Sequence, residues 1–99
     1  MYLKCPDLSE NKIVSYFTNI NNNPYKFLFK WNEYCDCCFL SIYNNIGESI
    51  LTGIALTVNR DIITDNRLLP SLKFVNQYGL NLEPTPETLK DYVFVYTAE

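Results

Sequence analysis

The fold of this chain is decided by residues 25–57, which read YKFLFKWNEYCDCCFLSIYNNIGESILTGIALT. In the first part of this stretch apolar side chains recur at every second position, at Tyr25, Phe27, Phe29 and Trp31. A period of two is typical of a β-strand with one buried face. A second run, 37–43, is apolar on both faces, and a third, 49–57, returns after a break. The stretch predicts a three-stranded antiparallel meander.

The breaks inside the meander have the composition of turns. Residues 33–36 separate the first run from the second, and 44–47, with the sequence Asn-Asn-Ile-Gly, separate the second from the third. Asparagine and glycine tolerate positive φ, so the chain can reverse tightly at 44–47. Gly53 interrupts the third run, and an isolated glycine in a strand indicates a β-bulge.

Further short strands are predicted on both sides of the meander. Residues 12–18 alternate with apolar side chains on both faces, and the asparagine-rich break 19–24 leads from them into the meander. Another strand is expected to begin after Pro70, because proline cannot donate to a strand ladder. The run 92–97 is again apolar on both faces and predicts a buried final strand.

One helical turn fits between the last two strands. Within 84–91, Thr85 is placed to cap a helix and Pro86 to occupy its first position. The predicted fold class is therefore all-β: a small antiparallel barrel or sandwich of six to seven short strands, with at most one short helical turn near the C-terminus.

The length and composition of the chain predict one domain over residues 1–99. A chain of 99 residues has room for a single core, and its 47% hydrophobic and 19% charged residues argue against disorder. The lead 1–11 is expected to be an irregular arm or a short edge pairing. No apolar run is long enough to span a bilayer and 1–10 do not resemble a signal peptide, so we expect a soluble, unexported protein.

Charge and residue types disfavour several functions. The formal net charge is -3 and the eight Lys and Arg residues are scattered, which disfavours nucleic-acid binding. The chain has no histidine, which removes the commonest general base, and its three glycines are too far apart to form a phosphate loop. Carboxylates such as Glu48, Asp61 and Asp65 form no recognisable catalytic pair. We therefore predict no catalytic residue, no cofactor and no metal.

The four cysteines form an unusual pattern, with three of them in the segment Cys35-Asp36-Cys37-Cys38. This spacing differs from that of a tetrahedral zinc site, since only Cys5 remains elsewhere and no histidine can complete the ligand set. A chain of this apolar content does not need a disulfide framework. The cysteines are therefore interpreted as thiols that pack as small side chains, with metal binding as the alternative.

The ordered residues of the meander resemble those of the small plug proteins of contractile phage tail baseplates. The resemblance rests on Phe27, Phe29, Trp31 and Asn32, then 39–43, Gly47 and 50–56, and it extends over residues 25–97. The chain departs from that pattern near 68–71, where a glycine-rich turn is expected, and its cysteines are its own.

The resemblance implies a non-enzymatic virion protein with a small β-barrel-like fold. It implies a position in the hub region of the tail baseplate, beside tail-tube and spike proteins, in multiple copies and without nucleic acid or membrane. Such a protein is made in the host cytoplasm.

Apolar residues in predicted turns are the candidate interface residues, because their own domain has less reason to bury them. They are Ile20, Tyr34, Ile46 and Tyr78. Each could instead fold back over the core. An alternative function is a small β binding module that recognises a peptide or a carbohydrate through exposed aromatics such as Tyr2, Tyr34 and Tyr78.

Overall fold

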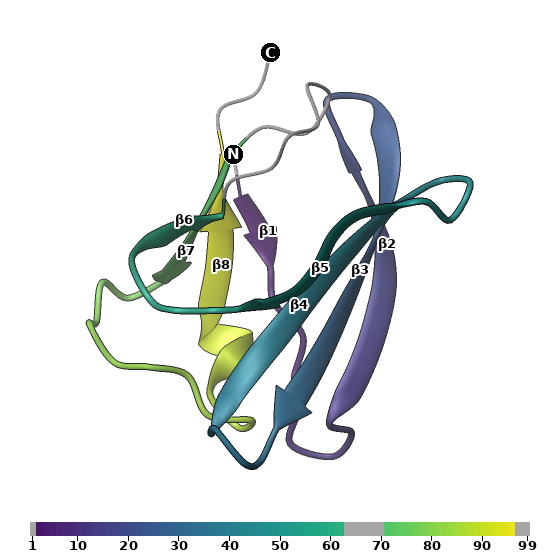
Figure 1. Ribbon diagram of the computed structural model, residues 1–99. Helices are drawn as coiled ribbons and strands as arrows, with labels where there is room; N and C mark the ends of the chain where they lie inside the picture. The colour runs from purple at the N-terminus through teal and green to yellow at the C-terminus, as the bar shows by residue number, and fades with distance from the viewer. Residues whose placement is uncertain (1, 63–70, 97–99) are drawn as a thin grey trace.

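The computed structural model describes residues 2–62 and 71–96, and this part of the chain forms two antiparallel sheets of four strands each (Figure 1). The strands are β1 (Tyr2–Lys4), β2 (Ile13–Ile20), β3 (Asn23–Asn32), β4 (Cys37–Asn44), β5 (Ser49–Ala55), β6 (Arg60–Ile62), β7 (Leu72–Asn76) and β8 (Tyr92–Val95). The predicted all-β antiparallel sandwich is confirmed. The predicted six to seven strands were too few, since Tyr2–Lys4 in the N-terminal lead also forms a strand.

The strand order separates the chain into a local sheet and a non-local one. The first sheet has the order β2-β3-β4-β5, so each strand pairs with its neighbour in sequence. The second has the order β1-β8-β7-β6 and brings the N-terminal strand beside the last one. The predicted meander is confirmed as β3-β4-β5.

The hairpin between β2 and β3 is tighter than the sequence predicted. Instead of a break over 19–24, only Asn21 and Asn22 lie outside the strands, with φ values of 50° and 67°. Two consecutive positive φ values are typical of the two-residue hairpin turns that asparagine favours. Ile20 therefore pairs with Asn23 as the last residue of β2 and does not lie in a loop.

Aromatic side chains fill the space between the two sheets. Tyr25, Phe27, Phe29 and Trp31 are all buried on one face of β3, as their period predicted. Phe94 of β8 meets this row from the opposite sheet, with ring centroids 5.9 Å from Phe27 and 6.0 Å from Phe29. Such tilted and edge-on aromatic pairs add to the free energy gained from burial alone. The core therefore joins the two sheets directly.

The pairing of β4 with β5 contains the predicted bulge. Leu40 lies opposite Ile54 and Ile42 opposite Leu51, so Thr52 and Gly53 share the position opposite Ser41. Gly53 has φ 61°, and its N–H donates to Ser41 Oγ at 3.0 Å. A second register shift follows between Ile42 and Tyr43. The bulge at Gly53 is confirmed.

The predicted helical turn is present, slightly later than expected. It is a 3-10 turn at Leu89–Asp91 with Thr88 as its N-cap residue, preceded by a turn that begins at Thr85. Thr85 Oγ1 accepts the N–H of Thr88 at 3.2 Å, and Thr88 Oγ1 accepts the N–H of Thr85 at 2.8 Å. The two threonines thus close the turn reciprocally. The strand expected after Pro70 is confirmed as β7, whereas residues 68–70 lie outside the described part.

Candidate functional site

Three of the four predicted interface residues are exposed and one is buried. The relative exposures are 103% for Tyr34, 74% for Ile46 and 69% for Tyr78, whereas that of Ile20 is 0%. Ile20 was chosen because it was expected in a turn. Since the turn contains only Asn21 and Asn22, Ile20 stays in the strand and its side chain points into the core.

The three exposed residues are held by the same local structure. Each follows two positions after an asparagine that ends a strand, and its N–H donates to the side-chain oxygen of that asparagine. The pairs are Asn32 with Tyr34 at 2.9 Å, Asn44 with Ile46 at 3.1 Å and Asn76 with Tyr78 at 2.8 Å. An asparagine side chain that bonds the backbone two residues on forms an Asx-turn. We call these three segments the Asx-turns of Tyr34, Ile46 and Tyr78.

Further hydrogen bonds fix each Asx-turn. Asn44 Oδ1 also accepts the N–H of Glu48 at 2.9 Å, and the N–H of Gly47 donates to the carbonyl of Asn44 at 3.1 Å. The N–H of Gly79 donates to the carbonyl of Asn76 at 3.0 Å. Gly47 and Gly79 both have positive φ, which places them at the end of each reversal. The exposed apolar side chains therefore project from bonded turns.

An open hollow lies beside each Asx-turn. One of about 360 Å³ is lined by Phe17, Lys26, Tyr43, Asn44, Asn45 and Gly47. A second, of about 390 Å³, includes Asn76 and Gln77 with Tyr2 and three valines, and a third, of about 330 Å³, includes Asn32, Glu33 and Tyr34 with Lys12 and Lys30. Each exposed apolar residue is thus next to a concave surface, which suits contact with another protein better than an isolated side chain does.

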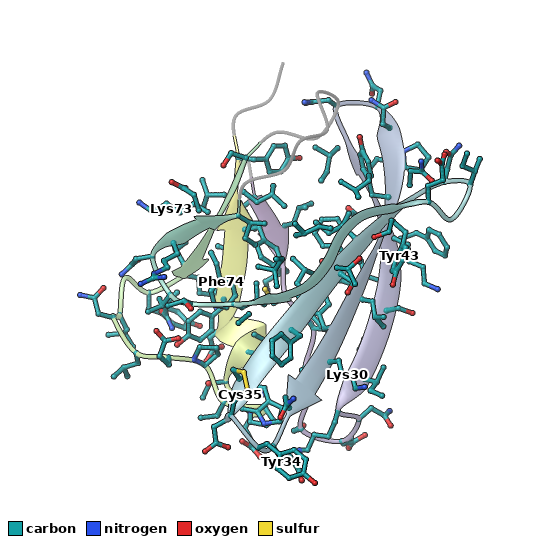
Figure 2. All side chains as sticks on the ribbon, viewed as in Figure 1. Lys30, Tyr34, Cys35, Tyr43, Lys73 and Phe74 are labelled. Atoms are coloured by element: carbon teal, nitrogen blue, oxygen red, sulfur yellow. A yellow bond between two sulfur atoms is a disulfide. The ribbon has the colours of Figure 1, made fainter. Side chains whose placement is uncertain are left out.

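The three Asx-turns lie at different corners of the molecule. The turn of Tyr34 is at the lower end of the β3–β4 hairpin, that of Ile46 at the upper right between β4 and β5, and that of Tyr78 at the left after β7 (Figures 1 and 2). The structure therefore does not gather the predicted residues into one patch. Of the aromatics considered for ligand binding, Tyr2 lines the hollow beside the turn of Tyr78, while Tyr34 lies in a separate hairpin.

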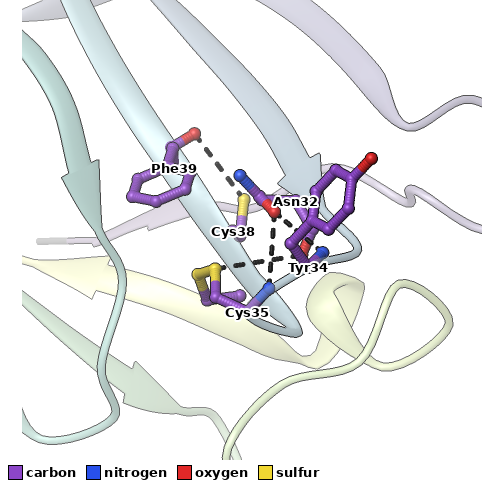
Figure 3. Close-up of a disulfide and its surroundings, with 6 residues drawn as sticks. Asn32, Tyr34, Cys35, Cys38 and Phe39 are labelled. Atoms are coloured by element: carbon purple, nitrogen blue, oxygen red, sulfur yellow. Dashed lines mark hydrogen bonds between the residues drawn. A yellow bond between two sulfur atoms is a disulfide. The ribbon is translucent and has the colours of Figure 1, made fainter.

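The turn of Tyr34 contains a disulfide that the sequence analysis did not predict. Cys35 and Cys37 are bonded, with their Cα atoms 5.4 Å apart, on either side of Asp36, which has φ 51° (Figure 3). The interpretation of all four cysteines as thiols was wrong for this pair. A strand would have kept Cys35 and Cys37 apart along one face, but the reversal at Asp36 brings their side chains together.

The remaining cysteines are buried thiols without a nucleophile's surroundings. Burial raises the pKa of the Cys38 thiol to about 12. Burial, with a smaller contribution from nearby Cys38, raises the pKa of Cys5 well above its usual range. Both groups therefore stay protonated at neutral pH, whereas a reactive cysteine needs a thiolate.

Residues that could bind a metal are not gathered in the described part of the chain. Over 2–62 and 71–96 no group of three or more Cys, Asp or Glu side chains is placed to hold an ion. Glu48 is exposed in the Asx-turn of Ile46 and Asp61 is exposed on β6, while Asp65 lies outside the described residues. In the same residues no helix is long and apolar enough to cross a membrane.

The outward face of β2 is a candidate surface that was not among the predicted interface residues. Ile13 is 58% exposed and Phe17 is 72% exposed, and both point away from the core. The signal was present, because the run 12–18 is apolar on both faces while only one face of an edge strand can be buried in a sandwich. The half-buried side chains of Val14 and Tyr16 take the inward positions.

The fold and these surfaces define a small structural β-sandwich that presents fixed apolar side chains to its surroundings. Residues 4–99 match the family described as cyanophage baseplate Pam3 plug gp18, and the chain belongs to that family. It is thus a phage baseplate plug protein, part of the virion tail, that associates with other baseplate components. This confirms the resemblance inferred from residues 25–97. A comparison with curated proteins found no match.

Proposed function

We propose that the chain is a non-enzymatic component of the baseplate hub that packs against tail-tube and spike proteins through the Asx-turns of Tyr34, Ile46 and Tyr78. The observation that carries this proposal is their common construction: an asparagine at the end of a strand holds an exposed apolar residue two positions on. An exposed apolar side chain gains free energy when a partner covers it, and a fixed turn loses little conformational entropy in the process.

The distribution of the three turns supports a role among several neighbours. A plug that fills a space between other proteins must touch them on more than one side, and the three turns lie at separate corners of the sandwich (Figure 1). A catalytic site would instead need convergent polar groups around a reacting atom. The buried thiols Cys5 and Cys38, with raised pKa values, offer no such group.

The test is incorporation of the chain into tails. A phage lacking the gene is complemented with a variant carrying Tyr34→Ser, Ile46→Ser and Tyr78→Ser, and the amount of the chain in purified tails is measured. We expect the triple variant to fold and to be lost from the particles, because its exposed anchors are gone.

The matched control is Leu82→Ser, which removes an exposed leucine outside the three Asx-turns. It should be incorporated at the wild-type level. Normal incorporation of the triple variant, with a circular dichroism spectrum like that of the wild type, would refute the proposed contacts.

A further inference from the structure

β2 is an edge strand, and the pairing with β3 shows which of its backbone N–H and C=O groups point to the open edge of the sheet. It pairs with β3 at all eight residues in a single register, from Ile13 with Lys30 to Ile20 with Asn23. The N–H of Trp31 donates to the carbonyl of Lys12 at 2.8 Å, so residues 12 and 31 form a hydrogen-bonded pair of the antiparallel ladder. Because bonded pairs alternate in an antiparallel ladder, the even-numbered residues of β2 bond to β3 and the odd-numbered ones face the open edge.

The open edge carries the N–H and C=O groups of four residues. They are Ile13, Ser15, Phe17 and Asn19. Among the described residues, none of the backbone hydrogen bonds outside the strand ladders involves any of them. The strand order places β2 at the margin of its sheet, and Figure 1 shows it at the right-hand side with no other strand beyond it. These groups are free to accept another strand.

The other three edges of the two sheets are poor templates for pairing. Within the described residues, β1 and β6 have only three residues each. β5 is longer, but two register shifts interrupt it and Gly53 bends it at φ 61°. Short or bulged edges are the usual means by which proteins prevent strands of other molecules from adding to a sheet. β2 lacks these features.

The sequence of β2 also lacks the residues that protect an edge. It reads IVSYFTNI, with no charge, no proline and no glycine. Lysine or proline is the common protection on an exposed edge. On the outward face Ile13 and Phe17 are exposed apolar side chains with Ser15 between them. An added strand would place its own side chains beside both.

We propose that β2 pairs antiparallel with β2 of a second copy of this chain, with Ser15 of one copy opposite Ser15 of the other. Among the described strand edges, only another β2 matches this one in length and regularity, because the remaining edges are short or bulged. In this register Ile13 of each copy faces Phe17 of the other. An aromatic side chain opposite a β-branched one is a favourable cross-strand pair, and the smallest side chain lies on the two-fold axis.

The charged groups near the edge do not oppose this pairing. Lys30 and Lys26 lie on β3, one strand inside Ile13 and Phe17, so the lysines of the two copies are separated from each other by both β2 strands. No charged side chain of β2 meets its own copy across the axis. The pairing would join two four-stranded sheets into one sheet of eight strands.

The first test is disulfide cross-linking of Ser15→Cys. Cys5 and Cys38 are buried and Cys35 is bonded to Cys37, so the new cysteine is the exposed thiol of the described part. Across the two-fold axis the two new cysteines face each other, within the Cα separation that a disulfide spans. We expect a covalent dimer under mild oxidation at micromolar protein concentration.

The matched control is Asn19→Cys, at another outward position of the same strand. In the proposed register Asn19 faces Asn11 of the other copy, so the two introduced cysteines lie about 27 Å apart along the strand at about 3.4 Å per residue. Cross-linking should be at least about tenfold greater for Ser15→Cys. Equal cross-linking of the two variants would indicate random collision and would overturn the proposal.

The second test measures association without a cross-link. Ser15→Pro removes an N–H that faces the open edge and leaves the ladder to β3 intact, whereas Ser15→Ala keeps that N–H. By sedimentation equilibrium, Ser15→Pro should weaken dimerisation on the order of tenfold, because both copies lose a hydrogen bond. Ser15→Ala should associate like the wild type. A monomeric wild-type chain at 100 times the concentration used for cross-linking would refute the pairing.

A wild-type monomer that crystallises or copurifies with a strand of another baseplate protein on β2 would likewise overturn self-pairing. These tests use the purified chain and do not depend on incorporation into tails. Failure of self-pairing and failure of the proposed hub contacts are therefore distinguishable.

Discussion

β2 and β5 form the two edges of the same sheet, and they are built differently. β2 pairs with its neighbour over eight consecutive residues, whereas β5 pairs with β4 at four positions with two register shifts. β2 ends in Ile20, which is buried, while the C-terminal half of β5, from Thr52 to Ala55, is exposed and contains Gly53 at positive φ. One edge is regular and open, and the other is irregular.

The difference shows that an edge strand can pair regularly with its neighbour inside the sheet and still leave its outer backbone groups open. The aromatic core holds both edges in place, since Phe27 and Phe29 of β3 contact Phe94 of the other sheet. Only β5 has the bulges that prevent pairing with another strand. An edge that is well packed yet unprotected is the one expected to associate.

The largest expected effect is that of Ile20→Ala at the anchored end of β2. Ile20 is fully buried, so removing its side chain should lower the free energy of unfolding by about 2–5 kcal/mol in urea denaturation. Ile46→Ala, at an exposed residue, should change it by less than about 0.5 kcal/mol. Equal losses for the two variants would show that the β2 end is not anchored in the core.

Raising the pH should weaken both edges together, because it acts on the core between the sheets. Burial raises the pKa of Cys38 to about 12 in the folded protein, whereas an unfolded thiol ionises near about 8.5. The unfolded state therefore loses its proton first, so stability falls as pH rises from about 9 to about 12, by about 1.4 kcal/mol per pH unit for this group.

Urea denaturation at pH 7, 9, 10 and 11 measures this slope, and Cys38→Ala provides the comparison. That variant should be less stable at pH 7 but should lose less stability between pH 9 and 11. A slope identical to that of the wild type would show that Cys38 does not cause the loss of stability at high pH.

Gly53→Ala tests the irregular edge. Gly53 has φ 61° and nothing lies within 4 Å of the position of an added Cβ, so the cost comes from the backbone alone. A non-glycine residue in this region costs about 1–2 kcal/mol. Gly53→Asn should cost less, since asparagine tolerates left-handed conformations. If alanine and asparagine proved neutral in urea denaturation, β5 would not depend on its bulge.

The smallest effect on stability is expected on the outward face of β2. Phe17 is exposed, so Phe17→Lys should change the free energy of unfolding by less than about 0.5 kcal/mol. The same change at Phe27, which is buried, should prevent folding or nearly so. Thermal denaturation of both variants distinguishes the outward face of β2 from the buried face of β3. A large loss for Phe17→Lys would mean that the outward face contributes to the core.

Much of the fold could be predicted because the alternation of apolar residues identifies the strands and their buried faces. The alternation at 25–31 identified the buried face of β3, and Gly53 identified the bulge in β5. At β1 the sequence predicts only an irregular arm or a short edge pairing, because three residues are too few to show alternation. Ile20 was placed wrongly, since sequence composition suggested a loop of six residues where two asparagines with positive φ suffice.

The candidate surfaces were predictable only in part. The predicted turns identify the apolar residues Tyr34, Ile46 and Tyr78, but the asparagine two positions before each shows its role only in the hydrogen bonds of the folded chain. The disulfide depends on the reversal at Asp36, which no spacing rule gives. The open edge of β2 depends on strand order, which places none of the described strands on that side of the sheet.

Amide hydrogen exchange of β2, measured residue by residue at two protein concentrations, tests the central claim most directly. In dilute protein the amides of Val14, Tyr16 and Thr18 should be protected by β3, while those of Ser15 and Phe17 should exchange rapidly. At high concentration Ser15 and Phe17 should become protected as the second copy pairs. Rapid exchange of both amides at every concentration would contradict the account.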